Sequence, residues 1–415
     1  MAANLDLKNE IASIVATLKK EGKIHLAKCI EKNWKKTAIV YSKELNSWKP
    51  AKPMEEEMIA AFEKELKRIE AEEPIKIIDS LKKNRILQTA PHLGATEGPR
   101  MLCVNYLGSL GVPPEDFYMV GMFSGIPFSN RSRPGRINKK EASVNLFGSS
   151  MQDGLVYRSV ITEKLIEGIE GLDNKIKELL PKAKIGDSYT SWALKACSNI
   201  ERKILKKENL IYLDINEVVA EYLIRVLQNK DHIFYKIFFD PSTQKEFTEA
   251  FPNEIIFYSP IVEGKYEKME NVVFKNGMLE SKNKKIPLNN EENLINELKH
   301  HRLCPALITG FLSLAFINQF KCLGSFAQVE YLPVYQQKLS KLKFMEKIDI
   351  KNIPTSNLTT GTFDENVYPV DIILGEKFPP NRDPLFGELL IPIKEVLLKS
   401  YFTGDQRNYA KKSEK

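Results

Sequence analysis

Cysteine and histidine are scarce in this chain, which holds five of each among its 415 residues. The cysteines are odd in number and none belongs to a Cys-x-x-Cys pair, which argues against a disulfide framework and favours reduced thiols in the cytoplasm. The histidines form no His-Glu-x-x-His pattern, and the adjacent His300 and His301 would diverge on a helix or a strand. We therefore expect neither a structural metal nor a set of metal ligands.

Long hydrophobic runs are missing as well. The longest, over 303–317, is interrupted by Pro305 and Gly310 and is shorter than the roughly 20 residues that cross a bilayer, so it predicts a buried helix. The first ten residues contain two acidic side chains and lack the basic start and apolar centre of a signal peptide. These features predict a cytoplasmic protein with no membrane partner.

Charge is close to balanced, since 61 lysines and arginines face 54 acidic residues and give a net charge of +7. Lysines spread over helix faces are usually solvated surface. The chain has no zinc finger, no ribonucleoprotein aromatic motif and no basic region followed by heptads. This balance permits transfer RNA as a partner without requiring it.

Alternating helical and strand-like patterns predict an α/β protein with a parallel sheet. A buried strand at 85–89 leads through a glycine turn to a helix over 100–110 and a second strand over 117–122. Two parallel strands joined by a helix form a β-α-β unit, whose crossover is right-handed by strong preference. A further strand over 210–213 is expected to run into a helix.

The middle of the chain changes its pattern. Apolar residues alternate over 232–239, and Asn276-Gly277 is a favourable pair for a tight hairpin turn, so we expect strands there. The predicted regions are an N-terminal helical layer (1–80), the first half of the core (81–230), a β-rich insertion (231–290), and a helical second half of the core with the C-terminal tail (291–415).

The stretch 89–99 gives the clearest signal for a ligand, because a strand passes through His92, Gly94 and Gly98 into a helix. The first amides of a helix have no intrahelical partner and lie at its positive end, while glycines let a phosphate or carboxylate approach closely. A histidine beside such a turn is seldom needed for packing. Glu97 fits two interpretations: a base or amine ligand, or an acidic residue that complements the helix dipole.

Other polar residues follow the predicted strands or lie in loops. The loop 129–140 carries five basic residues, which are either solvated or in contact with an anion. Asp214 and Asn216 stand at a strand end, where ligands bind in open parallel sheets, but Asp214 is also suited to cap the next helix. Further pocket candidates are Tyr118, Asn130 and Asp153.

Thr89, Gly94, Gly98 and Pro99 have the spacing T-x-x-x-x-G-x-x-x-G-P. This resembles the TGQQ-x-G-L-x-TGP motif of the cysteine-adding enzymes of bacillithiol synthesis, with His92 where that family has its second Gln. The resemblance implies a Rossmann-like core similar to that of class I aminoacyl-tRNA synthetases, and a ligand role for the glycine turn.

The likeness is weaker beyond that motif. Cys304 stands before a proline where the family usually has Arg, and Gly324 keeps one glycine of its GPGE turn. The family's acidic-His motif after the second strand is replaced by the residues 122–127. We therefore extend the fold and the ligand role to this chain, but not the cysteine-adding reaction.

The segment His92-Leu93-Gly94-Ala95 is also similar to the HIGH signature of class I synthetases and nucleotidyltransferases, in which the histidine contacts a phosphate. The segment 338–342 is similar to their lysine-rich signature, which holds the pyrophosphate. These similarities imply ATP with magnesium as co-substrate.

The sequence therefore predicts a ligase or transferase that joins an amino acid, or a similar carboxylate, to a small-molecule amine. Its predicted catalytic residues are His92 and Glu97. Two alternatives stay open: a non-catalytic small-molecule-binding module of the same fold, and an aminoacyl-tRNA-dependent transferase. The residues predicted to bind substrate or nucleotide are Thr89, Gly94, Thr96, Gly98, Arg131, Arg133, Arg136, Lys338 and Lys341.

Overall fold

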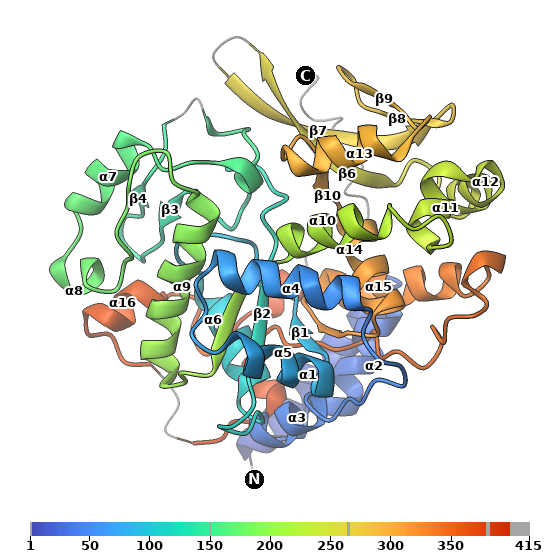
Figure 1. The fold of residues 1–415 in the computed structure, drawn as a ribbon. Coiled ribbons are helices and arrows are strands. Elements are labelled where there is room, and N and C mark those ends of the chain that lie inside the picture. The colour runs from blue at the N-terminus through green and yellow to red at the C-terminus, as the bar shows by residue number, and fades with distance from the viewer. Residues whose placement is uncertain (1, 149–150, 264–265, 379–381, 399–415) are drawn as a thin grey trace.

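The computed structural model describes residues 2–148, 151–263, 266–378 and 382–398 (Figure 1). Five helices precede the first strand, in the region where the sequence predicts a helical layer. Each helix turns an apolar stripe inward, as α4 does with Met58, Phe62 and Leu66. They are α1 (Ala2–Lys20), α2 (Ile24–Asn33), α3 (Ala38–Leu45), α4 (Glu56–Arg68) and α5 (Pro74–Asn84).

A four-stranded parallel sheet forms the centre of the molecule, in the order β11-β1-β2-β5. Its strands are β1 (Ile86–Gln88), β2 (Tyr118–Met122), β5 (Leu210–Asp214) and β11 (Lys321–Leu323). Helix α6 (Pro99–Ser109) joins β1 to β2, which confirms the predicted β-α-β unit. The chain is thus a mixed α/β protein with a parallel sheet.

The connection from β2 to β5 is long and combines loops, a short two-stranded sheet and helices. Its elements are β3 (Arg136–Ile137), β4 (Val144–Asn145), the 3₁₀ turn η2 (Val156–Arg158), α7 (Glu163–Glu170), α8 (Asn174–Lys177) and α9 (Tyr189–Leu205). Strand β5 then runs directly into α10 (Ile215–Val226), and Asp214 caps this helix by accepting the Asn216 amide.

The prediction of strands at 232–239 is wrong, because this segment forms α11 (Ile233–Phe239), followed by α12 (Pro241–Ala250). Phe234, Ile237 and Phe238 are buried, and their i, i+3, i+4 spacing makes one helical face. The hairpin prediction is confirmed, since Asn276 and Gly277 turn with φ of 51° and 74°. The antiparallel strands are β6 (Ile255–Glu263), β7 (Tyr266–Lys275), β8 (Met278–Glu280) and β9 (Lys285–Pro287).

The last third is less helical than predicted. It supplies β10 (Cys304–Pro305), which pairs with β6, and β11, which completes the parallel sheet beside β1. The buried helix expected over 303–317 begins only at Leu307 and continues with π-helical geometry over Leu312–Ile317. The other helices are α13 (Glu291–Lys299), α14 (Leu307–Phe311), α15 (Phe326–Leu339), η4 (Lys343–Met345), α16 (Pro369–Leu374), η5 (Phe386–Leu389) and α17 (Lys394–Leu398).

Side chains of the central strands alternate between two hydrophobic cores, one on each face of the sheet. Leu87 and Met119 enter the core that contains α4, α5 and α10, whereas Ile86 and Val120 enter the core beneath α6 and α9. Figure 1 shows α4 and α5 lying across one face of the sheet. None of the helices in the described ranges is long and apolar enough to cross a membrane.

Candidate functional site

The carboxyl ends of the four parallel strands lie at one edge of the sheet, which is where open α/β sheets bind ligands. Two backbone hydrogen bonds extend the β1–β2 pairing beyond the strands: Leu93 N donates to Phe123 O at 2.8 Å, and Phe123 N donates to Pro91 O at 3.1 Å. His92 is thereby fixed beside Phe123 at this edge. The predicted strand-turn-helix therefore opens toward the ligand-binding side of the sheet.

The His92 ring is partly exposed, and its Nδ1 lies 3.2 Å from Oδ1 of Asn130. The same oxygen accepts the backbone amide of Ser132, so it is an acceptor and Nδ1 of His92 carries the proton. Burial lowers the pKa of His92, while the Asn130 contact opposes that shift. The neutral imidazole thus keeps Nε2 free to accept a proton.

Glu97 lies in the interior beneath α6, only 3% exposed. Burial and the nearby Glu201 raise its pKa well above the usual range. Its Oε1 has no hydrogen-bond partner among the described residues. No contact in the described chain joins Glu97 to His92, so the structure does not bring the two predicted catalytic residues together.

Thr89 and Thr96 use their hydroxyl groups to hold the site together. Thr89 Oγ1 donates to the Leu323 carbonyl at 2.8 Å and contacts Gln328 Oε1 at 2.9 Å, which ties β1 to β11 and α15. Thr96 Oγ1 accepts the Asn138 amide at 2.7 Å. Both hydroxyls therefore serve the fold in the free protein.

The two glycines of the turn have different surroundings. A side chain on Gly94 would meet the Pro134 Cα at 3.2 Å, so this glycine lets the basic loop pack against the turn. Gly98 is the N-cap of α6, and open space lies where its side chain would be. Only Gly98 therefore leaves room for a ligand at the start of the helix.

The predicted cations fall into two groups. Arg131, Arg133 and Arg136 are exposed on the loop that packs against Gly94. Lys338 lies in the last turn of α15 with its ammonium 5.1 Å from the centre of the Phe251 ring, and Lys341 follows that helix. The arginines accompany the His92 turn, whereas no contact in the described chain links the lysines to it.

Tyr118 and Asp153 do not join His92 either. Tyr118 is buried inside the sheet, where its hydroxyl accepts a hydrogen bond from Gln88, and the Asp153 side chain is exposed. Of these weaker candidates, only Asn130 touches His92.

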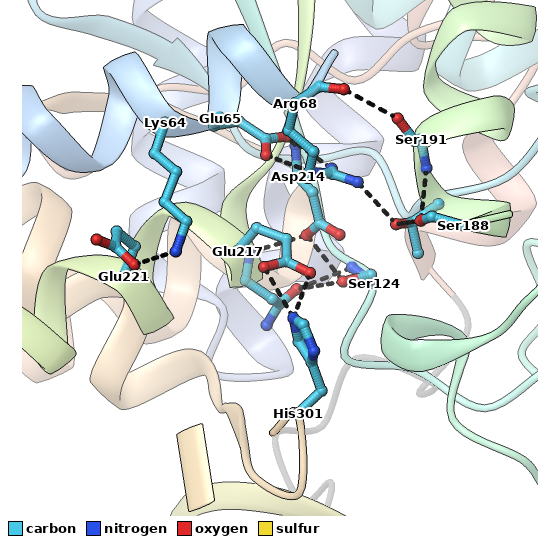
Figure 2. A network of polar contacts seen from close by, with 12 residues as sticks. Lys64, Glu65, Arg68, Ser124, Ser188, Ser191, Asp214, Glu217, Glu221 and His301 are labelled. Carbon is cyan, nitrogen blue, oxygen red and sulfur yellow. Dashed lines mark hydrogen bonds and ion pairs between the residues drawn. The ribbon is translucent and has the colours of Figure 1, made fainter. Parts of the chain in front are cut away.

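Figure 2 shows a second polar group at the same edge, centred on Asp214. Asp214 Oδ1 accepts the Ser124 hydroxyl at 2.8 Å in addition to the Asn216 amide at 2.9 Å. Asn216 Oδ1 in turn accepts the backbone amides of Ser124 and Gly125 at 2.8 and 3.0 Å. Asp214 is therefore both the predicted helix cap and a link between the ends of β2 and β5.

Glu65 and Arg68 of α4 complete this group through a two-point ion pair, with N···O distances of 2.6 and 2.8 Å. Glu65 also accepts the Asp214 backbone amide at 2.8 Å, which fixes α4 to the end of β5. Burial raises the pKa of Glu65 and Asp214, and the Arg68 guanidinium opposes both shifts. The ion pair thus places one cation, Arg68, against the buried carboxyl groups of Glu65 and Asp214.

The outer side of the group is formed by His301, whose Nε2 lies 3.0 Å from Oε1 of Glu217. Hydrogen bonding to Glu217 raises the pKa of His301. The ring also contacts Tyr157, whose buried hydroxyl has no partner within the described ranges, and Asp214 Oδ2 is likewise unsatisfied there. The group therefore keeps unused hydrogen-bonding atoms.

Sequence reasoning found Asp214 and Asn216 but missed Glu65, Arg68, Glu217 and His301. A Glu and an Arg three residues apart are ordinary on an exposed helix, so the pattern gave no signal of burial. Within the described ranges no group of three or more His, Cys, Asp or Glu side chains is arranged to hold a metal ion. No protein-family model, curated protein or solved structure matches this chain.

Proposed function

We propose that this chain is an enzyme with a Rossmann-like core that joins an amino acid, or a similar carboxylate, to an amine at the carboxyl edge of its parallel sheet. The order of the strands supports such a core. The chain proceeds from β1 to β2 to β5 in one direction, and β11 lies on the other side of β1. The order in which the strands are added therefore reverses beside β1. Open parallel sheets bind ligands in the crevice that such a reversal creates.

The observation that carries the proposal is the state of His92. Its Nδ1–H is engaged by Asn130, and its Nε2 has no hydrogen-bond partner among the described residues. When an amine attacks an activated carboxyl carbon, a carbon–nitrogen bond forms and the nitrogen must lose a proton. A neutral imidazole accepts that proton, and general bases of this kind contribute about 10²- to 10⁴-fold in rate.

The remaining groups fit the other parts of the reaction. Exposed arginines beside the turn suit a carboxylate or phosphate, because guanidinium binds both through two hydrogen bonds. ATP would activate the carboxylate as an acyl adenylate with release of pyrophosphate, and attack by the amine would then expel AMP. The proposal assigns no role to Lys338, Lys341 or Glu97 in these steps.

Replacing His92 by alanine tests this function. We expect His92→Ala to retain the thermal transition of the parent, because the backbone pairing beside Phe123 is kept, and to lose at least about 10²-fold in kcat, because the proton acceptor is removed. The assay is mass-spectrometric detection of condensed product from panels of amino acids and amines with ATP. His300→Ala is the matched control, since His300 is exposed at the end of α13 and its Nδ1 contacts only the Asn296 carbonyl of the same helix among the described residues.

An unimpaired His92→Ala variant would contradict the proposal. Tight calorimetric binding of ATP or amino acids by the parent without product would instead support a non-catalytic binding module. The parent enzyme should also lose activity on acidification with an apparent pKa below 6.5, because burial favours the neutral ring of His92.

A further inference from the structure

A cavity of about 340 Å³ lies at the end of the parallel sheet opposite His92, where the strands begin. It lies at the amino ends of β1 and β2, between the last turns of α3 and α5 and the loop 111–117. Four cationic residues, Lys43, Lys49, Lys83 and Arg85, are among those that line it, and Asp116 is the single acidic residue of the lining. The lining therefore carries a formal charge of +3.

Arg85 is the unusual member of this lining, because it is a buried cation without a counter-charge. Its side chain is 2% exposed, and its guanidinium donates to the backbone carbonyls of Asn318 and Lys52. Its Nε has no partner, and no carboxylate in the described chain pairs with it. Burial lowers the pKa of Arg85 to about 10, so the group is still charged at pH 7.

Buried charges in proteins are normally paired, because an isolated ion loses hydration that carbonyl dipoles replace only in part. Arg85 also has a left-handed backbone with φ of 40°, which is costly for a residue with a side chain. Such a residue persists where the surrounding structure holds it in place. An anion in the cavity would supply the charge that Arg85 lacks.

The rim of the cavity supports the same conclusion. Lys43 and Lys49 are exposed, and Lys49 donates to the neutral Asn84 side chain at 3.0 Å. Only Lys83 has an acidic partner, Asp116 at 3.3 Å. Two of the three rim lysines thus keep their charge available for a ligand.

The walls are held by direct hydrogen bonds between α3 and the end of α6. Ser42 Oγ donates to the Gly108 carbonyl at 3.1 Å and accepts the Gly111 amide at 2.7 Å, and Asn46 Nδ2 donates to the same carbonyl at 2.7 Å. A side chain on Gly111 would meet the Lys43 backbone at 2.5 Å. This close packing preforms the cavity.

We propose that this cavity binds a small molecule that carries a phosphate group, with the phosphate against Arg85 and the rim lysines. Its volume is at the lower end of the range for small-molecule sites. Val112 and Phe117 line the cavity too and offer apolar contact to the rest of the ligand. The site is separate from the proposed active site, because the two lie at opposite edges of the sheet.

Calorimetric titration with inorganic pyrophosphate at low ionic strength tests the site. The parent binds pyrophosphate, and the double variant Lys43→Gln with Lys49→Gln binds it at least about tenfold more weakly, since two hydrogen bonds from charged donors are lost. Lys20→Gln, on the exposed side of α1, leaves the affinity unchanged.

Asp116→Asn gives the sharpest readout, because removal of the only carboxylate in the lining tightens pyrophosphate binding. If the substitution only damaged the fold, pyrophosphate binding would become weaker instead. Arg85→Lys keeps the charge but loses the planar guanidinium, so a folded Arg85→Lys variant binds pyrophosphate more weakly. If this variant does not fold, the variants of Lys43, Lys49 and Asp116 still test the proposal.

Absence of binding by the parent at millimolar pyrophosphate overturns the proposal, as does affinity that none of these variants changes. Equal binding of succinate, which has two carboxylates and no phosphate, overturns the assignment to phosphate ligands. The measurement uses no amine or amino acid, so its failure is distinct from failure of the proposed enzymatic function.

Discussion

Glu97, just before α6, and Glu201, on α9, are both buried, and no cation faces either of them in the described part of the chain. Glu201 is held by the Tyr212 hydroxyl at 2.5 Å and by Asn105 Nδ2 at 2.8 Å. Burial raises the pKa of Glu201 to about 7, and the three hydrogen bonds that it accepts, including one from Cys197, moderate that rise. The free energy of unfolding therefore depends on whether Glu201 is protonated.

Glu201→Gln should make stability less dependent on pH. The folded pKa of about 7 exceeds the unfolded value of 4.5, so this residue favours the folded state fully below pH 4.5, and that advantage is lost as the pH rises through 7. The loss amounts to about 2 to 3 kcal/mol between pH 5 and pH 8. Urea denaturation at both pH values should show a smaller difference for Glu201→Gln than for the parent.

The exposed Glu208→Gln is the matched control and should keep the slope of the parent. The pKa of Glu97 is raised as well, so Glu97 contributes part of the pH dependence of stability in every variant. An unchanged slope in Glu201→Gln would show that Glu201 ionises normally in the folded protein.

Among the elements, α4 has the closest link to the carboxyl edge of the sheet. It precedes β1 in the chain, yet its Glu65 accepts the Asp214 amide at the end of β5, and its Arg68 donates to Thr190 at 3.1 Å at the start of α9. Figure 2 shows Glu65 and Arg68 near Asp214, with the exposed Lys64 on the same helix. Helix α4 thus supports the proposed site as well as covering the core.

Arg68→Ala should destabilise the protein by about 3 to 5 kcal/mol, because it leaves the buried Glu65 without its cation. Lys64→Ala should change the free energy of unfolding by less than about 1 kcal/mol, since Lys64 is 64% exposed in its pair with Glu221. Denaturant titration of the two variants provides the comparison. Equal losses of unfolding free energy in the two variants would show that the buried Glu65–Arg68 pair stabilises the protein no more than the exposed Lys64–Glu221 pair does.

At the scale of the whole molecule, the sequence predicts those parts in which neighbouring residues determine the structure. The units β1–α6–β2 and β5–α10 follow from contiguous apolar patterns, and the turn at Asn276-Gly277 follows from its residue types. Strand β11 is only three residues long, which is too short to show a period, and it becomes a strand by pairing with β1.

The candidate site shows the same limit. His92 and Asp214 are detectable because each follows a strand, whereas Arg68, Glu217 and His301 meet only because the fold brings distant segments together. Glu97 lies beside a predicted ligand turn, yet its side chain is buried in the interior near enough to Glu201 for that residue to raise its pKa, which no local pattern indicates.

The decisive experiment is a crystal structure of the protein with ATP and an amino acid from the panel. We expect ligand density at the carboxyl edge of the sheet, against Nε2 of His92 and the Gly98 end of α6, with an arginine of the 131–136 loop on the carboxylate or phosphate. Density confined to other parts of the molecule, with His92 uncontacted at saturating ligand, would contradict it.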